Sequence, residues 1–301
     1  MADGAWPQSD PLDAVLTTGE ARLAVDLRGG GLRELVDGDW RVLDGYPSGT
    51  LPHGRRGGVL FPWPNRLRDG RWRWDGADLQ LDVSSPETPN AIHGLVSWQP
   101  FSVLATEAGA LTVGTLLAPR PGFPFRLALS IDYALAPGRL TTTFRVRNVG
   151  ERAAPFGLGM HPYLRTGDRV DDADLTLPVR TALDLDGGLP TGGSRPFDGA
   201  VGRIGDRLLD DALTDLIRDD DGWARVRVGG PVGSIELALD GAWRWLQVYT
   251  GDTLPPDERR RSVAVEPMTC PPNALADGAD LVVLEPGGKW SGTFVLGWTR
   301  A

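Results

Sequence analysis

Short runs of alternating apolar and polar residues, separated by turn residues, dominate this chain. In residues 127–133 every second side chain is apolar, and after Ala136-Pro137-Gly138 the alternation resumes through residues 140–146. A period of two is typical of a β-strand that places one face on a core and the other toward water or a second layer. The pattern therefore predicts a long antiparallel hairpin in this region.

Similar runs predict strands along most of the sequence. Helical spacing is convincing only in residues 208–216, where we expect one short helix. No amphipathic helices of 10–15 residues separate the strands, which argues against a parallel α/β fold. We expect an all-β fold, a large antiparallel β-sandwich with very little helix, as a single domain over residues 1–301. The further strands are predicted at residues 22–27, 58–61, 71–74, 79–83, 111–116, 224–228, 234–239, 244–249, 262–265, 281–284 and 292–298.

Residues 251–261 have the composition of a loop. They contain Pro255-Pro256 and end in the consecutive arginines 259–261. A solvated surface loop is the preferred interpretation, because nothing beside the arginines supports a phosphate site.

Composition narrows the classes of partner. Apolar residues make up 41% of the chain, enough for a substantial core, and the net charge is −9. An acidic balance disfavours nucleic acid and anionic membranes. No apolar run approaches the roughly 20 residues of a membrane helix, and residues 1–10 do not resemble a secretory signal. The single cysteine allows no internal disulfide, which fits a reducing compartment, and we expect a cytoplasmic protein. Because of the acidic charge, we expect no nucleic-acid or membrane partner.

The candidate chemistry lies in two histidines and one glutamate. The chain has three histidines in 301 residues, and His93 and His161 fall in short segments rich in Pro, Gly and Asn. Glu266 ends an apolar run. Two imidazoles and a carboxylate can move protons near neutral pH. The eleven tryptophans are expected mainly in the core, although indole faces also suit sugar surfaces.

An ordered set of motifs resembles the aldose 1-epimerases (galactose mutarotases), and the resemblance extends from about residue 23 to residue 298. Each motif alone is weak, but the order is specific. The chain departs from the family pattern at Met160, Leu164 and Leu213, which leaves the preferred sugar open. The motifs are residues 61–66 (Phe-Pro-Trp-Pro-Asn-Arg), 90–94 (Asn-Ala-Ile-His-Gly), 159–163 (Gly-Met-His-Pro-Tyr), 209–216, 247–250, 265–269 (Val-Glu-Pro-Met-Thr) and 284–288.

The resemblance implies a role for each site residue. It implies that Glu266 is the general base, that His161 is the general acid, and that His93 binds or polarises the sugar. Sugar-binding roles are implied for Arg66 and Asp210, and Asn65 and Tyr249 within the motifs are expected to join them. From the residues alone, Arg66 could form a structural ion pair and Asp210 could cap the predicted short helix. His53 matches no motif and is expected to be a surface turn residue.

The implied reaction is mutarotation, which opens and recloses a sugar hemiacetal. A base takes the proton from the anomeric hydroxyl while an acid protonates the ring oxygen, and closure reverses both transfers. Each proton transfer by a positioned side chain increases the reaction rate roughly 10²–10⁴-fold. The expected partner is a free aldohexose such as glucose or galactose, with no cofactor and no metal, and the expected assembly is a monomer or homodimer.

Three alternatives remain open. The substrate could be a hexose 6-phosphate, for which Arg66, Arg68, Arg71 and the arginines 259–261 would supply positive charge. The chain could also be a carbohydrate-binding protein without catalysis. A metal site from His93, His161 and Glu266 is chemically sound, but these residues lie 68 and 105 positions apart with no local ligand pair.

Overall fold

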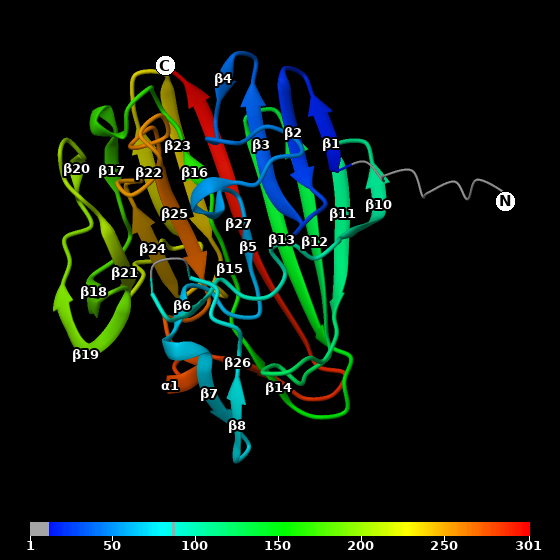
Figure 1. The fold of residues 1–301 in the computed structure, drawn as a ribbon. Coiled ribbons are helices and arrows are strands. Elements are labelled where there is room, and N and C mark those ends of the chain that lie inside the picture. The colour runs from blue at the N-terminus through cyan, green and yellow to red at the C-terminus, as the bar shows by residue number, and fades with distance from the viewer. Residues whose placement is uncertain (1–11, 86–87) are drawn as a thin grey trace, which may run out of the picture.

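The computed structural model describes residues 12–85 and 88–301, and β-strands make up most of this range (Figure 1). Its one α-helix there is α1 (Ala274–Asp277), and the remaining helical turns are the 3₁₀ segments η1 (His53–Arg55), η2 (Arg68–Gly70) and η3 (Val170–Asp172). The prediction of an all-β fold with very little helix is confirmed. The described residues contain no helix that is long and apolar enough to cross a membrane. Residues 1–10, on which the expectation about a signal was based, lie outside the described range.

The larger sheet has nine antiparallel strands, and the predicted hairpin lies near its middle. Its two strands pair over their full lengths, from Leu127 opposite Asn148 to Ala136 opposite Arg139. The strand order is β10 (Ser102–Glu107), β11 (Ala110–Leu117), β12 (Leu127–Ala136), β13 (Arg139–Asn148), β27 (Lys289–Arg300), β23 (Gly233–Leu239), β22 (Ala224–Gly229), β17 (Asp174–Thr176) and β20 (Gly202–Arg203).

The second sheet has eight strands and carries Glu266, Asp210 and Tyr249 among the predicted site residues. All of its pairings are antiparallel, and β16 (Tyr163–Leu164) joins it beside β25. The order of the other strands is β19 (Leu189–Pro196), β18 (Thr181–Asp186), β21 (Asp210–Thr214), β24 (Trp245–Tyr249), β25 (Val263–Met268), β15 (Gly159–Met160) and β5 (Val59–Leu60).

Smaller sheets lie at the two ends of the molecule. In Figure 1 a four-stranded sheet lies at the top, and the β7–β8 hairpin lies with α1 at the bottom. The four strands are β1 (Asp13–Thr18), β2 (Ala21–Asp26), β3 (Gly31–Asp37) and β4 (Trp40–Arg41), and the two-stranded pairs are β6 (Arg66–Leu67) with β9 (Ala91–Ile92), β7 (Arg71–Trp74) with β8 (Ala77–Gln80), and β14 (Ala154–Phe156) with β26 (Val282–Leu284).

Alternation along the central strands separates the core from a polar cleft. Every residue of β25 is buried, yet Val263 and Val265 join the main hydrophobic cluster while Glu266 lines a cavity. The same period of two places Gln247 and Tyr249 of β24 along that cavity. Successive side chains of a strand point to opposite faces, so one sheet can serve both the core and a site.

The predicted helix at residues 208–216 is wrong. Leu209, Leu213 and Leu216 have helical spacing, but the segment contains the strand β21, which pairs with β24 on one side and with β18 on the other. Sheet hydrogen bonds on both edges outweigh a weak local helical preference. Asp210 therefore cannot act as the cap of a helix, because it is the first residue of a strand.

The prediction of a solvated arginine run is wrong for Arg260. Its Nε donates to Asp171 Oδ1 at 2.7 Å and its Nη1 to Asp252 Oδ1 at 2.5 Å, and the residue is buried. Arg261 is half-buried and lies 3.1 Å from Asp44, whereas Arg259 is exposed. Buried guanidinium groups require carboxylate partners, and two of these arginines find them.

Candidate active site

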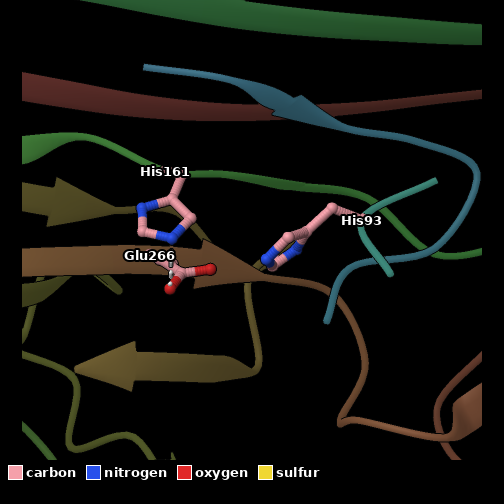
Figure 2. A group of neighbouring side chains, drawn as sticks. All are labelled: His93, His161 and Glu266. Atoms are coloured by element: carbon pink, nitrogen blue, oxygen red, sulfur yellow. Dashed lines mark ion pairs between the residues drawn. The ribbon is translucent and has the colours of Figure 1, made fainter. Parts of the chain in front are cut away.

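Glu266 and His161 face each other directly (Figure 2). Glu266 extends from β25, and His161 lies between β15 and β16, on the chain segment next to that strand. The Nε2 atom of His161 is 3.1 Å from Oε1 of Glu266. Both side chains are almost fully buried. The structure thus places the two expected proton-transfer groups in contact.

The backbone and a neighbouring ring fix the orientation of His161. Its N–H donates to the carbonyl of Gly58 at 3.0 Å, and its carbonyl accepts from the N–H of Gly57 at 2.9 Å. Its ring stacks on Tyr163 with centroids 4.9 Å apart and planes 6° from parallel. The guanidinium of Arg56 covers the same tyrosine ring, 5.2 Å from its centroid. The imidazole is therefore preorganised.

His93 approaches the pair from a tight turn, and Figure 2 shows its ring directed toward the other two side chains. Its φ of 60° lies in the left-handed region, which is uncommon for a residue with a side chain. The backbone N–H of Asn65 donates to Nδ1 at 3.2 Å, so the ring proton belongs on Nε2. The centroids of His93 and His161 are 5.5 Å apart.

A chain of hydrogen bonds crosses the sheet beside these histidines. Nδ2 of Asn65 donates to Oε1 of Gln247 at 3.2 Å, and Nε2 of Gln247 donates to Oδ1 of Asp210 at 2.6 Å. The backbone N–H of Arg66 donates to Oδ1 of Asn65 at 2.7 Å. The array thereby joins Asn65, which directly precedes β6, to the neighbouring strands β24 and β21.

All seven residues predicted from the sequence line one cavity of about 380 Å³, within the usual range for small-molecule sites. Tyr249 lies at its edge, where its hydroxyl is 2.8 Å from Oγ1 of Thr253. The seven are Glu266, His161, His93, Arg66, Asp210, Asn65 and Tyr249.

Four other residues of the wall were not among the predicted site residues. Gln247 and Tyr163 fall inside the quoted motifs, two residues from Tyr249 and from His161, and that position was the available signal. Arg55 and Trp98 had no motif to mark them. His53 is exposed, as expected, but it lies at the rim of the same cavity with Nδ1 3.2 Å from Oε1 of Glu258.

Burial favours the neutral forms of the central groups. It raises the pKa of Glu266 well above its ordinary value, and the Asp210 carboxylate raises it further while Arg66 lowers it. Burial also lowers the pKa of His161 to about 3, and the charges of Arg55 and Arg56 add to this effect. The pKa of His93 is well below its ordinary value, mainly because of burial. Desolvation therefore opposes every charge at the floor of the cavity.

The potential ligand atoms of His93, His161 and Glu266 lie within 4.8 Å of one another. Two imidazoles and one carboxylate at this spacing could hold a divalent cation. The fold thus removes the objection that the residues lie far apart in sequence. Within the described residues, Nδ1 of His161 and Oε2 of Glu266 are buried without a hydrogen-bond partner, which is a costly arrangement often found at functional sites.

A larger hollow of about 860 Å³ lies elsewhere, on strands β10 to β13 and β27. Its wall contains Arg145, Arg147 and Lys289 but no histidine or carboxylate among the residues that line it. It has no group that could accept a proton from a sugar hydroxyl near neutral pH. The smaller cavity around Glu266 is therefore the better candidate for chemistry.

The comparisons with solved structures agree with this architecture. A galactose mutarotase-like protein from Clostridium acetobutylicum superposes with a TM-score of 0.82 at 17% identity, and 95% of each chain is covered. A galactose 1-epimerase from Lactobacillus acidophilus NCFM superposes with a TM-score of 0.77 at 20% identity, over 96% of this chain and 94% of that one. At such identities the likeness establishes the fold.

Sequence comparison establishes the family. The protein YihR of Escherichia coli (strain K12) is 31% identical over 280 residues, which cover 90% of this chain and 88% of YihR. The protein YphB of the same organism is 30% identical over 159 residues, 49% of this chain and 50% of YphB. The family profile described as aldose 1-epimerase matches residues 14–297. The chain belongs to the aldose 1-epimerase family, a family of isomerases.

Proposed function

We propose that this protein interconverts the α and β anomers of a free aldohexose by acid–base opening and reclosure of the ring. The observation that carries the proposal is the 3.1 Å contact between His161 Nε2 and Glu266 Oε1 at the floor of a cavity. The anomeric oxygen O1 and the ring oxygen O5 are both bonded to C1. Two adjacent groups can therefore reach both oxygens of one hemiacetal.

In the ring-opening step Glu266 takes the proton from the O1 hydroxyl and His161 gives a proton to O5. The C1–O5 bond breaks and O1 becomes the oxygen of an aldehyde. Rotation about C1–C2 presents the other face of the carbonyl. Closure then reverses both transfers, because O5 attacks C1, His161 takes back its proton and Glu266 returns one to O1. Both groups end as they began, so no co-reactant is needed.

Electrostatics explains why a direct contact suits this reaction. The forms Glu266-COO⁻ with protonated His161, and Glu266-COOH with neutral His161, contain the same single proton and the same net charge. Burial favours the second form, since it raises one pKa and lowers the other. Ring opening begins from the first form and produces the second, so the burial of the pair favours both proton transfers in the opening direction.

The surrounding residues orient the sugar. His93 donates from Nε2, because Nδ1 already accepts from Asn65. Asp210 and Arg66 bind sugar hydroxyls, and Asn65 and Tyr249 complete the polar wall. Trp98, which is 52% exposed, offers an indole face to the sugar C–H groups.

The decisive test is the variant Glu266→Gln, which keeps the shape of the side chain and removes the base. We expect anomer exchange, followed by polarimetry of freshly dissolved glucose and galactose, to fall about 10²–10⁴-fold. Sugar binding, measured by calorimetry, should be kept. The matched control is Glu107→Gln on the exposed strand β10, which should keep full activity.

Two other outcomes would point to different functions. If the unmodified protein binds sugars but does not speed anomer exchange, it is a carbohydrate-binding protein. If elemental analysis finds a stoichiometric metal and chelation abolishes turnover, the three clustered ligand residues serve a metal centre instead of a proton relay.

A further inference from the structure

Arg55 is a residue of the cavity wall to which the proposed chemistry gives no task. It ends η1, its φ is 56°, and it lines the cavity that contains Glu266 and His161. Its guanidinium lies over the ring of Trp98, 5.3 Å from the centroid, and Trp98 lines the same cavity. A guanidinium stacked on an indole has its planar face covered and its N–H edge available for an acceptor.

The adjacent Arg56 differs from Arg55 in having carboxylate partners, although its Nη2 is also buried without a hydrogen-bond partner among the described residues. Arg56 lies 3.2 Å from Asp44, and it also pairs with Glu258. In contrast, no carboxylate among residues 12–85 and 88–301 forms an ion pair with Arg55, and its Nη1 is buried without a hydrogen-bond partner there. A charged group held in this way is costly unless an anion meets it.

Arg55 and His161 line the same cavity, and Arg55 is close enough for its charge to lower the pKa of that imidazole. In the proposed reaction His161 is the group that serves the ring oxygen O5. The carbon C5 is bonded to O5, so the substituent on C5, which is C6 with its oxygen, is the sugar group closest to that oxygen apart from O1. We propose that Arg55 and Trp98 form a subsite for an anionic group at C6, so that the preferred substrate is a negatively charged aldohexose. This inference rests on the proposed mutarotase function.

The subsite depends on one guanidinium, not on a basic patch. Of the arginines suggested from the sequence for a phosphate site, Arg66 lines the cavity, whereas Arg68 and Arg71 lie outside its wall and Arg260 is occupied by Asp171 and Asp252. A single Arg can bind a carboxylate, a sulfate or a phosphate through two parallel N–H groups. The shared chemistry is a compact oxyanion at C6.

The test compares neutral and anionic sugars in one anomer-exchange assay. The substrates are glucose, glucuronate, glucose 6-sulfate and glucose 6-phosphate, followed by NMR exchange. We expect kcat/KM to be about tenfold or more higher for at least one anionic sugar than for glucose, as one charge-assisted contact allows. The anionic sugar with the largest kcat/KM relative to glucose shows whether the subsite prefers a carboxylate, a sulfate or a phosphate.

The variant Arg55→Gln should bring the ratio of anionic to neutral kcat/KM close to one, mainly through KM, because this contact is made equally before and during the reaction. Arg55→Lys keeps the charge but not the two-pronged geometry and should keep part of the ratio. The matched control is Arg152→Gln, whose guanidinium also lies over an aromatic ring, that of Phe125, but outside the cavity. It should leave the ratio unchanged.

Two results would overturn the inference. One is a wild-type enzyme that shows no preference for any anionic sugar, with the proposed mutarotase function intact. The other is a preference that survives Arg55→Gln. If no sugar is turned over at all, the mutarotase function fails instead, and calorimetry of glucuronate, glucose 6-sulfate and glucose 6-phosphate against glucose still decides whether Arg55 binds an anion.

Discussion

At the scale of single residues, the proposed mechanism makes Glu266 and His161 one titrating unit. Their facing atoms are 3.1 Å apart, so we expect the pH dependence of activity to belong to the pair and not to either residue. We expect activity to require one proton on the pair. It is lost when a second proton is added at low pH or when the first is removed at high pH.

The loss of activity at low pH gives a measurable prediction. Because burial lowers the pKa of His161 to about 3, a second proton is accepted only well below the ordinary pKa of histidine, about 6.5. We expect kcat/KM, which reports the free enzyme, to stay level down to roughly pH 5. Initial rates of anomer exchange across buffers, with circular dichroism at each pH to exclude unfolding, would check this. An acid limb near pH 6.5 in the folded protein would contradict it.

At the scale of elements, the sequence predicts the strands well because their signal is local. Alternation in β12 and β13 identifies the hairpin, and strand runs such as residues 224–228 and 234–239 fall inside β22 and β23. The exception at β21 has a physical reason. Its side-chain spacing suits a helix, and only the two neighbouring strands, which come from distant parts of the chain, decide the outcome.

The site was predictable to the extent that motifs mark it. Glu266, His161 and His93 were expected together, but their mutual contact depends on strand order, which alternation does not encode. Arg55 was missed because its importance lies in the lack of a partner among the described residues, a property of three-dimensional packing. Arg260 was misinterpreted for the same reason, since Asp171 is 89 residues away in sequence.

The loop of residues 251–261 gives a prediction at this scale. Arg260 in this loop forms one ion pair with Asp171 of η3 and a second with Asp252 of the loop itself. Leu254, also in the loop, lines the cavity. We expect Arg260→Ala to lower the free energy of unfolding by about 1–3 kcal/mol, since two carboxylates lose a partner. KM should rise as well, because the cavity wall loses its anchor.

Urea unfolding and sugar kinetics would measure both effects. The matched control is Arg259→Ala, because that arginine is exposed, and its stability should change by less than about 0.5 kcal/mol. Equal losses in the two variants would show that Arg260 does not anchor the loop.

At the scale of the whole molecule, one hydrophobic cluster collects residues from both large sheets, which supports our proposal of a single domain. Trp243 is part of this cluster and is fully buried, with Nε1 donating to the carbonyl of Thr293 at 2.9 Å. Its ring contacts the rings of Phe144, Trp290 and Phe294. The expectation that tryptophans mainly fill the core holds here, whereas Trp98 lies on the cavity wall and is 52% exposed.

These two tryptophans therefore separate stability from function. Trp243→Ala removes a large ring from a close-packed interior and should cost about 3–5 kcal/mol of unfolding free energy, while the folded fraction keeps its kcat. Trp98→Ala leaves little void and should change stability by less than about 0.5 kcal/mol, yet it should raise KM because it removes the platform for the sugar and the support of Arg55. Urea midpoints and anomer-exchange kinetics on both variants give the comparison. A Trp98→Ala protein with unchanged KM for every sugar would show that the indole is no part of the binding surface, and a Trp243→Ala protein as stable as the wild type would show that the two sheets do not depend on their shared core.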